Sequence, residues 1–157
     1  MSRRIRPVTV EAAAPQLGAP LVRLEGWESR LPAVIEWARS RPYAMGEHDC
    51  VRVAFRSVEA LTGEDLWERW GRQYTTKEEA FRIVREIGGG FTGCFSRIFG
   101  VDPLPMPAAR RGDVAEFQDP NGEKHLGVVT GANVAVLGEH GIAFISRSAC
   151  SHCWRIG

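Results

Sequence analysis

A cysteine and a histidine that lie far apart in the sequence have the surroundings needed for acyl transfer. Cys50 ends the segment 41–50 and begins an amphipathic helical stretch. At the first turn of a helix, unpaired backbone N–H groups and the positive end of the helix dipole favour the thiolate, which is the reactive form of cysteine. His125 begins a short apolar run and could accept the thiol proton. The two residues together predict nucleophilic catalysis by cysteine.

Two other cysteines near the C-terminus, Cys150 and Cys153, have the C-x-x-C spacing of a zinc or redox half-site. A structural zinc needs four ligands, and the sequence contains no second paired motif. In a strand, residues 150 and 153 would also face opposite sides of the sheet. We therefore expect two buried or free thiols, and we predict no metal and no cofactor.

Helices are predicted to carry the first half of the domain. Asp49 has the position of an N-cap, where its carboxylate would accept a backbone hydrogen bond from near Arg52 and so fix the direction of Cys50. Thr76 and Glu79 have the spacing of a capping box. Apolar periodicity predicts helices over residues 32–39 (starting at Pro32), from 50 to the terminator Gly63, over 76–87 and over 92–99, with a polar, aromatic loop over 63–75.

After residue 110 the pattern changes to short strand-like runs that glycine and asparagine separate. Asn121-Gly122 has the composition of a hairpin turn, and Gly127 would let the Cys50 helix approach the sheet. Strands are predicted over residues 113–117, 126–130, 133–137, 142–145 and 153–156. Helices followed by a run of antiparallel strands indicate an α+β domain.

The composition is that of one globular domain. The chain has 157 residues, of which 44% are hydrophobic and 25% charged. A net charge of +1 does not favour nucleic acid as a partner, and no apolar run reaches the roughly 20 residues of a membrane span. The start lacks the apolar core of a secretory signal, which predicts synthesis in the cytoplasm. We expect a flexible or docking arm over residues 1–22 and one domain over 23–157.

Three segments, in this order, resemble motifs of the NlpC-type cell-wall peptidases, a papain-like group. Residues 41–50 resemble the P-Y-x-x-G…D-C entry of that family, residues 111–117 its x-G-D-[LV]-x-x-F strand, and residues 125–129 its H-V-G-I-Y strand. The match covers roughly residues 40–137. Residues near Trp27, 41–50, 60–63, Arg72 and Tyr74 also resemble a branch encoded in the tail modules of tailed phages and prophages.

The resemblance implies a papain-like fold, in which helices carrying Cys50 pack on an antiparallel sheet carrying His125. It implies Cys50 as the nucleophile, His125 as the base and Tyr43 near the oxyanion. Such enzymes cut the peptide stems of peptidoglycan, and in a phage tail they would open a local hole for DNA entry. The implied partners are peptidoglycan stems and other tail-tip or hub proteins, and the implied location is the tail tip of the bacterial virus.

The sequence departs from the family pattern after the cysteine and on the strand that follows His125. Val51-Arg52 replaces the usual Ser-Gly, whose serine belongs to substrate recognition. The residue that orients the histidine should lie near Val136 or Leu137, and both are apolar. Polar residues that could reach back are His140, Glu139 and Asn133.

Three functions remain open at this level. The first is a tail-associated peptidoglycan hydrolase. The second is a tail-tip structural or assembly protein that uses the same fold with a weakened or inactive site. The third, weaker interpretation is an amidase or acyltransferase with a different amide substrate.

Overall fold

The structure is a computed structural model that describes residues 17–157, and it has the predicted α+β architecture. The helical part comprises α2 (Trp27–Arg39), α3 (Cys50–Thr62), α4 (Trp67–Trp70), α5 (Lys77–Gly88), α6 (Phe91–Phe99) and the short 3₁₀ turn η2 (Met106–Ala108). The sheet comprises β1 (Val114–Gln118), β2 (Lys124–Val129), β3 (Asn133–Gly138), β4 (Gly141–Ser146) and β5 (Cys150–Trp154), with the turn η3 (Arg147–Ala149) before β5.

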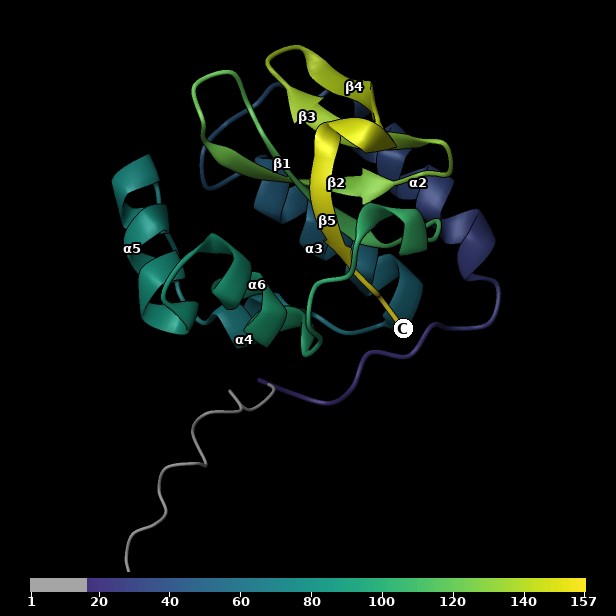
Figure 1. Cartoon of the computed structure of the whole chain (residues 1–157), viewed down its shortest axis with the longest axis horizontal. Coiled ribbons are helices and arrows are strands. Elements are labelled where there is room, and N and C mark those ends of the chain that lie inside the picture. Colours follow the sequence, from purple (N-terminus) through teal and green to yellow (C-terminus); the bar gives the residue numbers. More distant parts are fainter. Residues whose placement is uncertain (1–16) are drawn as a thin grey trace, which may run out of the picture.

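The five strands form one antiparallel sheet in the order β4-β3-β2-β1-β5. Helices α2 and α3 pack on each other, and α3 packs against β2, so they cover one face of the sheet. Helices α4, α5 and α6 gather beside the sheet rather than behind it (Figure 1). The start of α3 and the start of β2 therefore both border the space between the sheet and the α4–α6 group.

Two large apolar clusters hold these layers together, and a third, of Leu31, Leu61 and Val128, joins α2 and α3 to β2. The larger one joins α3 to α4–α6 and is rich in aromatic rings, among them Phe55, Trp70, Phe95 and Trp154, which are each at most 2% exposed. The smaller cluster lies between the sheet and the η2 segment and includes Cys150 and Cys153. Burial of this aromatic surface fixes the α4–α6 group against the helix that begins at Cys50.

The predicted helix ends of α3 and α5 are confirmed. The Asp49 side chain accepts a hydrogen bond from the Arg52 backbone N–H at 2.9 Å, and α3 ends at Gly63 in the left-handed conformation. Thr76 and Glu79 form the predicted capping box at the start of α5.

The prediction for the first helix is wrong at its start. Helix α2 begins at Trp27, so Pro32 lies inside the helix rather than in its first turn. Proline has no N–H and cannot satisfy the carbonyl four residues earlier, which belongs to Glu28. The Arg111 guanidinium donates to that carbonyl at 3.0 Å, and this contact from a distant loop lets the helix continue through Pro32.

Three other expectations need correction. Trp67–Trp70 forms the short helix α4 inside the segment expected to be a loop, and β5 begins three residues and ends two residues earlier than predicted. The pairing of β1 with β5 shifts register between Glu116 and Phe117, and both Cys150 and Cys153 belong to the same buried cluster. This irregularity breaks the simple alternation that would have pointed the two thiols apart. All four cysteines are free.

Asp113, from the Gly-Asp segment of the family-like motif, is fully buried and ties both ends of the domain together. Its carboxylate pairs with Arg23 Nη2 at 3.1 Å and with Arg155 Nε at 3.3 Å. It also accepts backbone hydrogen bonds from Arg110 and Ile156. This residue therefore holds the segment before α2 against the end of the chain, away from Cys50.

The predicted arm over residues 1–22 lies for the most part outside the described residues. Of the described part, Leu17 and Leu21 pack against the larger core cluster. Within residues 17–157, no helix has the length and apolar character needed to cross a membrane.

Candidate active site

Asp49 fixes the loop that leads into Cys50. Besides capping α3, its Oδ2 atom accepts from the Gly46 backbone N–H at 2.9 Å and from the Tyr74 hydroxyl at 2.6 Å. Gly46 has a φ of 82°, and a Cβ there would lie 2.2 Å from the Tyr74 carbonyl oxygen. The glycine and the aspartate together set the direction in which the first residue of α3 points.

Cys50 is a partly exposed residue whose sulfur is held as a neutral thiol. Desolvation by the surrounding protein raises the pKa of the Cys50 thiol to about 12, although hydrogen bonds from the backbone N–H groups of Leu126, Cys50 and Val51 oppose the rise. The Leu126 contact places the sulfur next to β2, beside the backbone of His125. A nucleophilic role for Cys50 would therefore require a base that removes the thiol proton.

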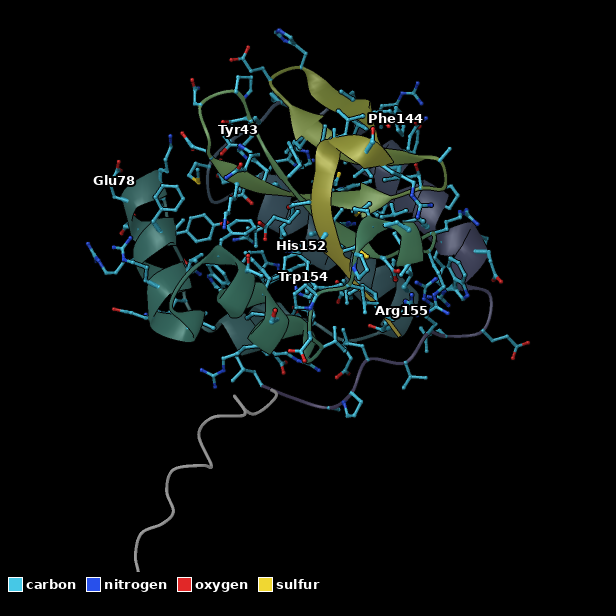
Figure 2. The ribbon with its side chains drawn as sticks, viewed as in Figure 1. Tyr43, Glu78, Phe144, His152, Trp154 and Arg155 are labelled. Carbon is cyan, nitrogen blue, oxygen red and sulfur yellow. The ribbon has the colours of Figure 1, made fainter. Side chains whose placement is uncertain are left out.

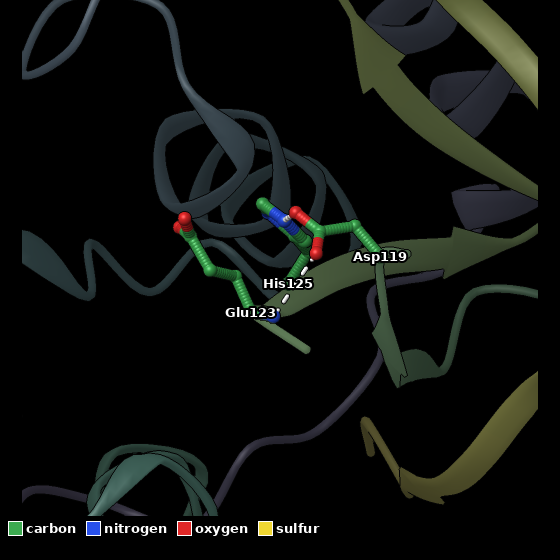
Figure 3. Close-up of side chains that lie close together, drawn as sticks. All are labelled: Asp119, Glu123 and His125. Atoms are coloured by element: carbon green, nitrogen blue, oxygen red, sulfur yellow. Dashed lines mark hydrogen bonds and ion pairs between the residues drawn. The ribbon is translucent and has the colours of Figure 1, made fainter. Parts of the chain in front are cut away.

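His125 lies in β2, and Asp119 holds its ring in place. His125 Nε2 lies 2.9 Å from Asp119 Oδ2 (Figure 3). The imidazole also stacks on the Phe117 ring, with centroids 5.3 Å apart. Asp119 is itself oriented, because its Oδ1 atom accepts from the backbone N–H groups of Asn121 and Glu123 in the β1–β2 turn. The hydrogen bond to His125 lowers the pKa of the Asp119 carboxyl.

This contact determines which nitrogen of His125 can act as a base. A carboxylate only accepts hydrogen bonds, so His125 Nε2 carries the proton that Asp119 binds. Nδ1 is then the basic nitrogen of the neutral ring. Within residues 17–157, no hydrogen bond joins the Cys50 sulfur to the imidazole.

Cys50 and His125 line one cavity, which has a volume of about 70 Å³. The cavity lies between the start of α3, the start of β2 and the α4–α6 group, and most of its wall is apolar or aromatic. Tyr43 also lines it, and Figure 2 shows Tyr43 on the side of the sheet that faces α5. Desolvation raises the pKa of the Tyr43 hydroxyl to about 12, so this group stays a neutral donor.

The structure brings three of the four predicted site residues together and leaves the fourth outside. Cys50, His125 and Tyr43 share the cavity, whereas His140 lies exposed in the turn between β3 and β4 and is not among the residues that line the cavity in the described part of the chain. Sequence reasoning missed Asp119, which occupies the orienting role expected of His140. The only sequence signal for it is its place before the Asn-Gly turn of the β1–β2 hairpin.

Residues that depart from the family pattern have structural contacts. Val51 is buried in the larger core and lines the cavity. Arg52 stacks its guanidinium 3.9 Å from the Trp67 ring centroid and donates to the Gly46 carbonyl. Gly127 serves a purpose other than the one expected, because a Cβ there would lie 2.6 Å from a Val134 methyl group of β3 rather than against the helix.

One group of side chains in the described part of the chain is close enough to share a metal ion. Ligand atoms of Asp119, Glu123 and His125 lie within 4.8 Å of one another on the β1–β2 hairpin (Figure 3). Each already has a partner, because Asp119 binds His125 and Glu123 pairs with Lys77 at 2.7 Å. The arrangement is accounted for by these contacts without an ion.

Comparison with known protein families gives a match. Residues 22–156 match a family described as a domain of unknown function, DUF6950. The chain belongs to the DUF6950 family. The match spans nearly all the described residues, including Cys50, Asp119 and His125, but the family description assigns no activity. A search of curated proteins finds no relative.

Proposed function

We propose that this DUF6950 chain is a papain-like thiol hydrolase that cleaves an amide bond. The observation that carries the proposal is that a cysteine at a capped helix start and a carboxylate-oriented histidine line the same cavity. These are the nucleophile, base and orienting group that acyl transfer requires. The order of helices before an antiparallel sheet supports the papain-like assignment.

The reaction follows from the protonation states of the two groups. The Cys50 sulfur attacks the carbonyl carbon as His125 Nδ1 takes the thiol proton, because the raised pKa of the thiol disfavours a resting thiolate. Backbone N–H groups at the start of α3 are the donors available to the oxyanion. The C–N bond breaks, and the amine leaves with the proton from His125. Water, deprotonated by His125, then hydrolyses the thioester and restores the thiol.

The substrate that we propose is a peptide stem of peptidoglycan, cut by the chain as part of a phage or prophage tail tip. Motif resemblance to the NlpC-type peptidases supports this choice. The test is to incubate purified peptidoglycan with the wild type and with Cys50→Ala, and to identify released peptides by mass spectrometry. We expect release by the wild type alone, and equal products from both proteins would end the catalytic proposal.

A structural role in the tail tip is the second candidate, and the state of Cys50 favours it. A thiol with a pKa near 12 and a cavity of about 70 Å³ are also what an inactive descendant of a hydrolase would retain. In that case Cys50→Ala would leave particle assembly and infectivity unchanged. A hydrolase role instead predicts assembled particles that penetrate the cell wall poorly.

A further inference from the structure

The wall of the cavity beside Cys50 is mainly apolar, so it disfavours binding of a charged substrate group. Its lining includes Trp70, Val84 and Phe95, which are at most 7% exposed. Phe81 and Phe91 add two more aromatic rings to the apolar wall. Water makes few favourable contacts with such a wall. An apolar substrate group that displaces this water is therefore stabilised by the hydrophobic effect.

Charged side chains of the cavity lining come from the start of α5, from β2 with the turn that precedes it, and from Asp49 before α3, whose carboxylate already accepts three hydrogen bonds. Lys77 and Lys124 are the only lysines of the sequence, and both belong to this lining. Lys77 pairs with Glu123 across the gap between α5 and the β1–β2 hairpin, and Lys124 lies 3.7 Å from Glu116. Each cation is thus matched by a carboxylate, which leaves the apolar wall as the main determinant of what binds.

The size of the cavity limits the group that fits. An apolar cavity of about 150 Å³ accommodates benzene. The cavity here, at about 70 Å³, is less than half of that volume. It therefore suits an aliphatic side chain of a few carbon atoms, and a long hydrocarbon chain or a large aromatic ring exceeds it.

We propose that this cavity is a subsite for a small aliphatic side chain that flanks the carbonyl group attacked by Cys50. This inference rests on the proposed function, and it names the substrate class as amides whose residue next to the cleaved bond resembles alanine, valine or leucine. Ala80 of α5 has the smallest side chain among the residues that line the subsite. A longer side chain at position 80 would therefore reduce the space left for the substrate group.

The test uses alkylation of Cys50, which needs access to the sulfur but no turnover. The full chain is treated with iodoacetamide and its N-ethyl, N-butyl and N-octyl derivatives at one fixed pH. Peptide mass mapping separates Cys50 from the three other cysteines. We expect the rate at Cys50 to rise about fourfold per added methylene until the cavity is full, and to level off before the octyl reagent. Rates that stay flat, or that keep rising through octyl, would overturn the subsite.

Two cavity variants and one control sharpen the result. Ala80→Leu fills the subsite, so the gain for the butyl reagent should disappear while the iodoacetamide rate stays within about twofold. Val84→Ala enlarges it and should shift the preference to the longer reagent. Arg82→Leu changes an exposed residue of the same helix that does not line the cavity, and it should leave the series unchanged. If neither cavity variant changes the relative alkylation rates of the reagents, the proposal is refuted.

The outcome is separable from that of the proposed function. A butyl preference at Cys50 without release of peptides from peptidoglycan would support the subsite and refute the hydrolase proposal. Peptide release with no preference among alkyl groups would support the hydrolase proposal and refute the subsite.

Discussion

Replacing Asp49 with alanine should strongly destabilise the protein. The carboxylate accepts three hydrogen bonds, from the backbone N–H groups of Arg52 and Gly46 and from the Tyr74 hydroxyl, at 2.9, 2.9 and 2.6 Å. Asp49 is 2% exposed and Tyr74 is 4% exposed, so water cannot replace the lost acceptor without rearrangement.

The magnitude follows from these contacts. Loss of an N-cap costs about 1 kcal/mol. A buried donor left without an acceptor costs about 1–3 kcal/mol, and Asp49→Ala leaves two such donors, at Gly46 and Tyr74. We expect a loss of about 4 kcal/mol in the free energy of unfolding, because partial relaxation offsets the upper end of the sum. With a urea m-value of about 2 kcal/mol/M, the midpoint should fall by about 2 M.

A double-mutant cycle separates the cap from the tyrosine contact. Tyr74→Phe removes one partner and should cost about 1 kcal/mol. Once Asp49 is alanine, Tyr74→Phe also removes an unsatisfied hydroxyl, so the double variant should be more stable than additivity predicts by about 1–3 kcal/mol. Asp49→Asn, which keeps a capping oxygen, should fall between the wild type and Asp49→Ala. Urea unfolding at fixed pH measures the wild type and all four variants. Additive effects, or a loss below about 1 kcal/mol for Asp49→Ala, would refute the reasoning.

Three other outcomes are expected. Asp119→Ala should lower kcat for peptide release by about 10- to 1,000-fold with little change in unfolding midpoint, whereas Glu123→Gln on the same hairpin should keep most activity; equal losses would contradict the orienting role of Asp119. Asp113→Ala should lower the free energy of unfolding by about 3–5 kcal/mol in a urea titration, since it removes the charge partner of two partly buried arginines and the acceptor of the Arg110 and Ile156 backbone N–H groups, and a small loss would show that the Asp113 cluster is dispensable. The alkylation rate of Cys50 should rise about tenfold per pH unit toward pH 12, and a plateau below about pH 8 would show a resting thiolate instead.

The same raised pKa has a consequence for stability at high pH. Desolvation raises the pKa of Cys50 and Cys94 to about 12, above the value near 9 expected of an unfolded chain. The folded state therefore binds these protons more tightly, and the stabilisation is present below about pH 9 and lost as the pH rises toward about 12. Urea midpoints measured across this range should fall, and Cys50→Ser should reduce the slope. A midpoint that stays constant would contradict the desolvation of these thiols.

Local signals in the sequence predicted most of the elements that position the site. The N-cap at Asp49, the capping box at Thr76 and the terminator Gly63 act over three or four residues, so they could be read correctly from neighbours in the chain. Pro32 was misread because the group that satisfies the Glu28 carbonyl is Arg111, which is distant in sequence. Likewise, the register shift that places Cys150 and Cys153 in one cluster depends on how β5 pairs with β1.

Asp119 shows why the candidate site could be predicted only in part. The family pattern directs attention to the strand after His125, where Val136 and Leu137 offer no polar group. In an antiparallel hairpin, residues that lie diagonally across the two strands are close in space, and Phe117 pairs with His125 in this register. Asp119, two residues beyond Phe117, therefore reaches the imidazole from the opposite direction. Asp119 thus occupies the orienting position, but only the strand register reveals it. Replacing Asp119 with alanine is the direct test of whether the proposed catalytic arrangement depends on this contact.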